Sequence, residues 1–328
     1  MAYNSEMPVA SWGLYIIAPL QNSQSDRTLR LSNLLQGPRQ KSNFNFHSKS
    51  MLKCQRKVAP RLRCGLGNRL FQVMAAIGEA EQGQEKQKAD PVFFLPRMAA
   101  EHGGFDLIFQ LFPNIQTLES APEWLEVQEA HMAQTHTKAH TPTHNLTVLS
   151  GFFQDLKYFP KESTYLPKLP STLPPNDSWA IHFRFGDYTH LPHYHVNLSK
   201  YYFYTITKIP KHSTLTLFSD SPERLPAIQK ELEKLEYNVR IFNNPDTLET
   251  MKAFASCVKG SVCSNSTFAW WCAWFSWHQH KHEQYTAYFP NQWMVGQSPP
   301  NLFATPFTQA IRLEEISASP GLLSFSHS

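Results

Sequence analysis

One stretch constrains this chain more than any other, the ten residues Trp-Ala-Ile-His-Phe-Arg-Phe-Gly-Asp-Tyr at 179–188. Read with a period of two, it predicts a strand over 179–185 with one apolar face, while His182 and Arg184 share the other face. A charged arginine in such a run is costly to bury without an anionic partner. The strand ends just before Asp187, so Arg184 lies near the carboxyl end, where open parallel α/β sheets bind ligands. Two interpretations stay open: a bidentate phosphate or carboxylate ligand, or an ordinary ion pair with Asp187.

Strand and helix patterns alternate through the second half of the chain, which predicts a parallel, doubly wound α/β sheet. Further strands are expected at 215–220, 238–242 and near 262, and helices at 201–206, 222–235, 247–257 and after 266. Neither the dinucleotide fingerprint G-x-G-x-x-G nor the P-loop pattern occurs in the sequence, so neither kind of nucleotide binding is indicated.

The length of 328 residues suffices for two domains. Five prolines between positions 160 and 175 mark a linker. We therefore predict four regions, which are a poorly ordered polar and basic extension at 1–60, a first α/β domain at 61–165, a second at 176–300, and a tail at 301–328.

Composition narrows the classes of partner. The formal net charge is +4, and basic residues cluster at 53–63, but no aromatic residues interleave with them, so nucleic-acid binding is not favoured. The five cysteines show neither C-x-x-C pairing nor zinc-like spacing, and we expect reduced, mostly buried thiols. No apolar run reaches the roughly 20 residues that span a bilayer. A soluble, cytoplasmic protein is expected.

Two polar loops before helices are candidate anion sites. Gly65 and Gly67 allow close backbone approach, and Asn68 stands at the start of an apolar helical pattern. In the second half, Ser264-Asn-Ser-Thr267 precedes a helix rich in tryptophan, where hydroxyls add to the positive end of the helix dipole. The alternative interpretation is a simple chain turn in the first loop and plain helix capping in the second.

Several separated segments together resemble the α1,2-fucosyltransferases, which are inverting enzymes that use GDP-fucose. The segments, in chain order, are Gly65-Leu-Gly-Asn-Arg-Leu-Phe-Gln72, Gly151-Phe-Phe-Gln-Asp-Leu-Lys-Tyr-Phe159, His182-Phe-Arg-Phe-Gly-Asp-Tyr188, Phe218-Ser-Asp220, Ser264-Asn-Ser-Thr-Phe-Ala-Trp-Trp271 and Pro290-Asn-Gln-Trp293. The third segment resembles the H-x-R-R-G-D-Y motif that α1,6- and protein O-fucosyltransferases share. The resemblance covers about residues 64–293 and leaves both ends of the chain outside.

The resemblance implies a GT-B-like α/β fold, with two Rossmann-type domains facing a central cleft. The domain at 61–165 would lie on the acceptor side, and the domain at 176–300 would bind GDP-fucose. It implies transfer of L-fucose from GDP-fucose to the 2-hydroxyl of a galactose-terminated glycan, without a metal or other cofactor. Arg184 would bind the pyrophosphate and stabilise the leaving charge, and Asn68 would reach the donor phosphate or the transferred sugar. His182 would contact the nucleotide or place Arg184, Asp220 would hold the guanosine, and Ser266 with Thr267 would hold the phosphates. The remaining donor-binding positions would be Asn265, Gly65 and Gly67.

Two positions depart from the family pattern. Phe185 stands where the motif has a second arginine, and Arg69 where it has glutamine. On the strand register Phe185 points away from Arg184, so Arg184 is the expected phosphate ligand. Asp187 is one candidate for the general base, and transfer with a weak or solvent base is equally open. Loss of the second arginine also leaves open a catalytically inactive glycan- or nucleotide-binding protein. Animal relatives are anchored in the Golgi by an N-terminal helix, which is the alternative location if the N-terminus is truncated.

Overall fold

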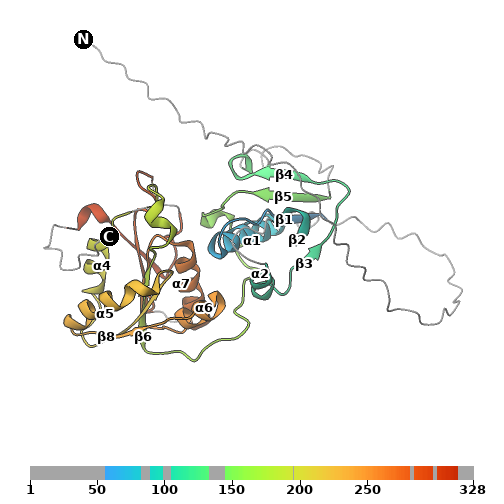
Figure 1. Cartoon of the computed structure of the whole chain (residues 1–328). Helices are drawn as coiled ribbons and strands as arrows, with labels where there is room; N and C mark the ends of the chain where they lie inside the picture. The colour runs from blue at the N-terminus through green and yellow to red at the C-terminus, as the bar shows by residue number, and fades with distance from the viewer. Residues whose placement is uncertain are drawn as a thin grey trace, which may run out of the picture. The chain divides into compact units, whose positions relative to one another are not determined.

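The computed structural model describes residues 56–82, 89–98, 105–132, 145–194, 196–280, 284–297 and 301–316. Most of the predicted extension lies outside these ranges. Within them the chain forms two all-parallel sheets with helices, which confirms the expected α/β class (Figure 1). Among the described helices, none combines the length and the apolar character that crossing a bilayer requires.

The first sheet has the strand order β3-β2-β1-β5-β4. Its strands are β1 (Lys57–Pro60), β2 (Asp90–Phe94), β3 (Gln116–Leu118), β4 (Leu125–Gln128) and β5 (Leu146–Ser150). Helix α1 (Leu66–Glu81) follows β1, and the short α2 (Asp106–Leu111) lies between β2 and β3. Strand β5 pairs directly with β1, so the loops after these two strands emerge side by side at one edge of the sheet.

The second sheet has the order β11-β10-β9-β6-β7-β8. Its strands are β6 (Ser178–Phe183), β7 (Thr214–Ser219), β8 (Asn238–Ile241), β9 (Gly260–Val262), β10 (Ala287–Pro290) and β11 (Thr308–Ile311). In chain order this is the 3-2-1-4-5-6 arrangement of a Rossmann fold. The strand order reverses between β6 and β9, and the carboxyl ends of these two strands define the place where such sheets bind ligands.

The helices of the second half cover both faces of this sheet. Helices α4 (Ser199–Ile206) and α5 (Leu225–Lys234) pack on the face that contains Ile181 and Phe183. Helices α6 (Thr247–Ala255) and α7 (Thr267–His280) pack on the face that contains Ala180. Phe185 packs with Ile181 and Phe183 on the first of these two faces. The alternation of side chains that the sequence predicts for 179–185 is therefore confirmed.

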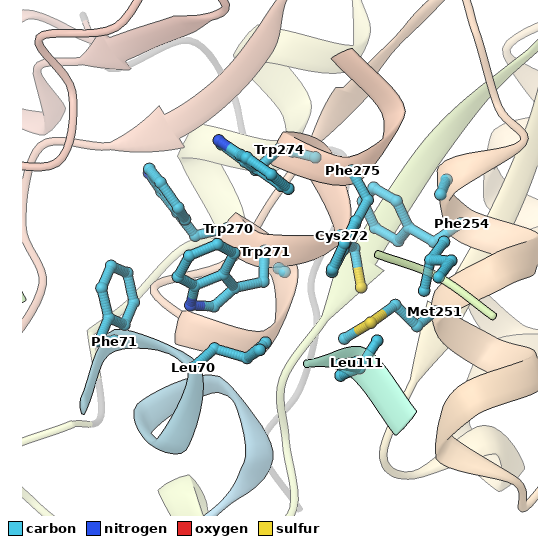
Figure 2. Packing of buried hydrophobic residues seen from close by; sticks show 14 of the residues in the cluster. Leu70, Phe71, Leu111, Met251, Phe254, Trp270, Trp271, Cys272, Trp274 and Phe275 are labelled. Carbon is cyan, nitrogen blue, oxygen red and sulfur yellow. The ribbon is translucent and has the colours of Figure 1, made fainter. Parts of the chain in front are cut away.

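A single hydrophobic cluster connects elements of the first and second halves. Phe71 of α1 has its ring centroid 5.2 Å from that of Trp270 and 5.0 Å from that of Trp271 of α7. Figure 2 shows Leu70 and Phe71 pointing from α1 toward these tryptophans. Both tryptophans are fully buried, and such large aromatic contacts contribute strongly to core stability. Helices α1 and α7 are thereby held against each other.

Two predicted boundaries were wrong. The extension was expected to reach residue 60, but Lys57–Pro60 forms β1, the central strand of the first sheet. Its sequence is short and surrounded by basic residues, so it lacks the apolar length that identifies a buried strand. The tail was expected from residue 301, yet it supplies the edge strand β11 and buries Leu302 and Phe307 in the core. The division at the proline-rich segment stays a prediction.

Candidate functional site

Arg184 follows the last residue of β6 and lies between two carboxylates. Its Nη2 is 2.6 Å from Oδ1 of Asp187, and its Nη1 is 3.0 Å from Oδ2 of Asp220, which follows β7. The ion pair with Asp187 that the sequence left open is therefore present. The Arg184 side chain keeps 29% of its exposure, so the guanidinium is held in place and remains accessible from solvent.

Asp220 also fixes the backbone that leads out of β6. Its Oδ1 accepts a hydrogen bond of 2.9 Å from the N–H of Phe185. A Cβ added to Gly186 would lie 2.2 Å from Oδ2 of Asp220, so only glycine permits this approach. Both carboxylate oxygens of Asp220 are engaged within the protein. Its contacts therefore suit the positioning of Arg184, and the role at guanosine inferred from the resemblance stays a prediction.

Phe185 takes no part in this ion-pair arrangement. Its ring stacks on Phe183 at 5.9 Å with planes 7° apart, and it is largely buried among the residues that α4 and α5 cover. An arginine at this position would have to place its charge in an apolar environment. Phe185, which replaces the second arginine of the motif, thus lies on the opposite side of the strand from Arg184. The contacts of the Arg184 side chain do not involve it.

His182 connects the two strands between which the strand order reverses. Its Nδ1 lies 2.9 Å from Oγ of Ser264, which follows β9, and both side chains are buried. Burial, together with the nearby positive charge of Arg184, lowers the pKa of His182 to about 3. The imidazole is therefore neutral near pH 7 and acts as a hydrogen-bonding group that orients the turn into α7.

Tyr188 is a part of the site to which sequence reasoning gave no role. Its ring lies under the guanidinium of Arg184, with 5.1 Å between Cζ and the ring centroid. Its hydroxyl donates to the carbonyl of Asn265 at 3.2 Å, and burial raises the pKa of this phenol. The tyrosine thus connects Arg184 to the polar loop before α7. Its position in the H-F-R-F-G-D-Y segment is the sequence feature from which a role for this tyrosine could have been inferred.

Of the polar residues at the start of α7, some hold neighbouring loops in place and one remains accessible to solvent. The amide of Asn265 donates to the carbonyls of Tyr194 and Trp293, at 3.2 and 2.8 Å, so this side chain holds two loops together. Ser266 is nearly buried. Thr267 begins the helix and keeps partial exposure. The first N–H groups of an α-helix have no partner within it, which leaves this end suited to an anion.

The N-terminus of α1 meets the N-terminus of α7. A Cβ on Gly67 would lie 2.5 Å from both Oγ1 of Thr267 and the backbone nitrogen of Phe268. Any larger residue would force these two helix ends apart. At Gly65, by contrast, a Cβ would meet nothing within 4 Å. The glycine-rich loop and the hydroxyl-rich loop singled out in the sequence are therefore in contact, which brings the N-termini of α1 and α7 together.

Asn68 lies in the first turn of α1, and its side chain is held by Gln154. Nε2 of Gln154 donates to Oδ1 of Asn68 at 2.9 Å. This contact fixes the orientation of the amide, so that Nδ2 of Asn68 faces away from Gln154. Gln154 belongs to the G-F-F-Q segment, to which the sequence analysis assigned no role. Its contact with Asn68 spans 86 residues and could not be read from local patterns.

No protein-family model and no curated protein matches the chain. Among solved structures the chain is similar to the crystal structure of selenomethionine fucosyltransferase NodZ from Bradyrhizobium, with a TM-score of 0.42 and 11% sequence identity. The match covers 66% of this chain and 91% of the other. A similarity this distant does not bear on activity, so the functional assignment depends on the geometry of the site and on the sequence motifs.

Proposed function

We propose that the chain is a GT-B-like galactoside α1,2-fucosyltransferase. It would transfer L-fucose from GDP-fucose to the 2-hydroxyl of a terminal galactoside, with inversion at the transferred carbon. The donor class is supported by the geometry around Arg184, and the linkage is supported by the motifs that resemble the α1,2 family.

One observation carries the proposal: Arg184, the N-terminus of α1 and the N-terminus of α7 converge near the carboxyl ends of β6 and β9. Contacts of His182 with Ser264 and of Tyr188 with Asn265 connect Arg184 to α7. The contact of Gly67 with Thr267 connects α7 to α1. A guanidinium and two helix N-termini together favour a ligand with several negative charges, such as the pyrophosphate of a nucleotide sugar.

The main requirement of the reaction is stabilisation of the negative charge that develops on the leaving GDP. The bond between the anomeric carbon of fucose and the β-phosphate oxygen breaks, and its electron pair leaves with GDP. The acceptor oxygen forms the new bond on the opposite face and loses its proton. Arg184 and the backbone N–H groups at the start of α7 would stabilise the negative charge on the phosphate, which is commonly the largest contribution to catalysis. This positive potential comes from the protein, so we expect transfer without a divalent metal.

Asn68 would contact the donor from the first half, with its orientation set by Gln154. Asp187 is held by Arg184 at 2.6 Å, an arrangement that supports a role in holding the guanidinium rather than in accepting a proton. We therefore favour transfer in which solvent or a weak base takes the proton of the acceptor after the fucose–phosphate bond has largely broken.

The test is GDP release from GDP-fucose in the presence of EDTA, with and without lactose. Release that lactose stimulates, together with a product carrying α1,2-linked fucose by NMR, is the expected result. A product with another linkage would retain the fucosyltransferase assignment and overturn the α1,2 assignment. GDP binding without release, for any galactoside tried, would instead identify an inactive binding protein.

A further inference from the structure

An arginine and an exposed aromatic ring lie together at the carboxyl edge of the first sheet. Arg63 lies just beyond β1, and Phe152 lies just beyond β5, the strand that pairs with β1. The Cζ atom of Arg63 is 4.8 Å from the ring centroid of Phe152, and Phe152 keeps 39% of its exposure. In the described ranges, the Arg63 side chain has neither an ion pair nor a hydrogen bond. Its neighbours Arg56 and Arg61 are paired with Glu79 and Glu126.

The loop that carries Phe152 is rigidly held. Oε2 of Glu129 accepts hydrogen bonds from the N–H groups of Phe152 and Phe153, at 2.8 and 3.0 Å. Phe153 has a φ of 54°, which is strained for a residue with a side chain, and it is fully buried in edge-to-face contact with Tyr158. Strain of this kind is commonly retained at functional sites. The exposed ring is therefore presented at low entropic cost to a ligand.

A buried glutamine fixes the two loops relative to each other. Oε1 of Gln72 accepts from the N–H of Arg63 at 3.0 Å, and Nε2 donates to the carbonyl of Gly151 at 3.2 Å. Gln72 is completely buried within α1. Removing either bond would leave a buried polar group unsatisfied, which is costly. The distance between Arg63 and Phe152 is thus fixed by hydrogen bonds of a buried side chain.

The pair lies close in the chain to the residues assigned to the donor. Gln154, two residues after Phe152, holds Asn68. Arg63 is followed by Cys64, which has a φ of 63°, and then by the Gly65 loop. A ligand on the pair would therefore lie beside the loops that the proposed function assigns to the donor.

We propose that Arg63 and Phe152 form the acceptor subsite and bind a neutral saccharide. This inference rests on the proposed function and adds to it the residues that select the acceptor. The ring of Phe152 offers a flat apolar surface for the C–H face of a pyranose. The guanidinium of Arg63 offers several N–H donors for the hydroxyl groups around it. An aromatic surface with one well-placed polar group is the common composition of small-molecule sites.

The test is a comparison of Phe152→Ala, Phe152→Tyr and Arg63→Gln with the wild-type protein, with lactose as acceptor. Phe152→Ala and Arg63→Gln should each raise the KM for lactose about tenfold or more, as loss of a central aromatic or arginine contact does. Phe152→Tyr should restore most of the affinity. The KM for GDP-fucose and its slow hydrolysis in water should stay within about twofold for all three variants. Leu125→Ala is the matched control, because Leu125 is 47% exposed and lies at the start of β4, at the amino end of the strands, whereas Arg63 and Phe152 follow their carboxyl ends.

The possible failures are distinguishable. An unchanged KM for lactose in Phe152→Ala, in a protein that still transfers fucose, would overturn the subsite and leave the proposed function intact. Equal losses for lactose and GDP-fucose would also overturn it, because they would indicate a general structural effect. Absence of both GDP binding and donor hydrolysis in the wild-type protein would refute the proposed function itself.

Discussion

Nδ1 of His182 and Oγ of Ser264 lie 2.9 Å apart, and this contact joins the end of β6 to the loop that begins α7. It crosses the point at which the strand order of the second sheet reverses. The contact matters for two reasons. It determines where the N-terminus of α7 lies relative to Arg184, and it holds in a buried position an imidazole that burial keeps neutral near pH 7.

The first prediction concerns the dependence of stability on pH. The folded-state pKa of His182 is about 3, below the ordinary value of 6.5, so between these values only the unfolded protein binds the extra proton. Stability should therefore fall as the pH drops below 6.5, by roughly 1.4 kcal/mol per pH unit from this residue. His182→Asn should lack this part of the decline. Urea unfolding from pH 4.5 to 7 measures the difference, and parallel curves for the two proteins would contradict the assignment.

The second prediction concerns Arg184. Arg184→Lys keeps the charge but cannot contact Asp187 and Asp220 as two separate partners in the same geometry. We expect kcat to fall by about 10² to 10³, as when one donor to a developing negative charge is lost. The unfolding free energy should change by about 1 kcal/mol or less, because the pairs are partly exposed. A variant with wild-type kcat would refute the proposed role of the guanidinium.

The third prediction separates two roles for Asp187. Its carboxylate accepts a hydrogen bond from Nη2 of Arg184, so a diphosphate must compete with Asp187 for this donor. Asp187→Asn should bind GDP several-fold more tightly, while kcat stays within about tenfold of wild type. Calorimetric titration with GDP and steady-state kinetics give the two quantities. A large fall in kcat with unchanged GDP affinity would identify Asp187 as the general base.

The fourth prediction uses the two glycines before α1 as a matched pair. Gly67→Ala would place a methyl group against Thr267 and Phe268, and we expect a loss of about 1–3 kcal/mol in stability. Gly65→Ala meets no neighbouring atom and should fold normally. If the donor approaches this loop closely, Gly65→Ala should nevertheless raise the KM for GDP-fucose. Equal thermal stability of the two variants would contradict the contact between α1 and α7.

The fifth prediction concerns thiol chemistry. Cys257, Cys263 and Cys272 are buried, and burial raises the pKa of each thiol, that of Cys263 to about 12. Cys64 is partly exposed beside Gly65. Iodoacetamide should therefore modify Cys64 well before these three, and GDP should slow the reaction. Peptide mapping by mass spectrometry reads each site separately. Labelling of Cys64 at the same rate with and without GDP would place the nucleotide elsewhere.

Much of the second sheet could be predicted because its strands carry clear local signals. The alternation in 179–185 correctly placed Phe185 in the core and Arg184 on the opposite face. The cap of α6 was also predictable, since Asp246 accepts a hydrogen bond from the N–H of Glu249 as a polar residue before a helix commonly does. Periodicity was informative wherever an element has one consistently apolar face.

The remaining features depend on contacts between distant parts of the chain. Asp187 is three residues from Arg184, and an ion pair between them was one of the two interpretations of the sequence, whereas Asp220 follows the neighbouring strand β7. The bonds of Gln72 to Arg63 and Gly151 need the pairing of β1 with β5, which no local pattern indicates. Strands β1 and β11 were missed for a related reason, since each is short and is stabilised by its neighbours in the sheet rather than by its own composition.

The contact of Phe71 with Trp270 and Trp271 also has a consequence for how the chain can be divided. Two fragments produced by a cut in the segment between β5 and β6 would each expose a large part of one shared apolar surface. Neither fragment should remain monomeric and folded alone, because the buried area that one lacks is carried by the other. Mixed together, the fragments should reassemble as a heterodimer, with tryptophan fluorescence reporting the recovery of the native environment.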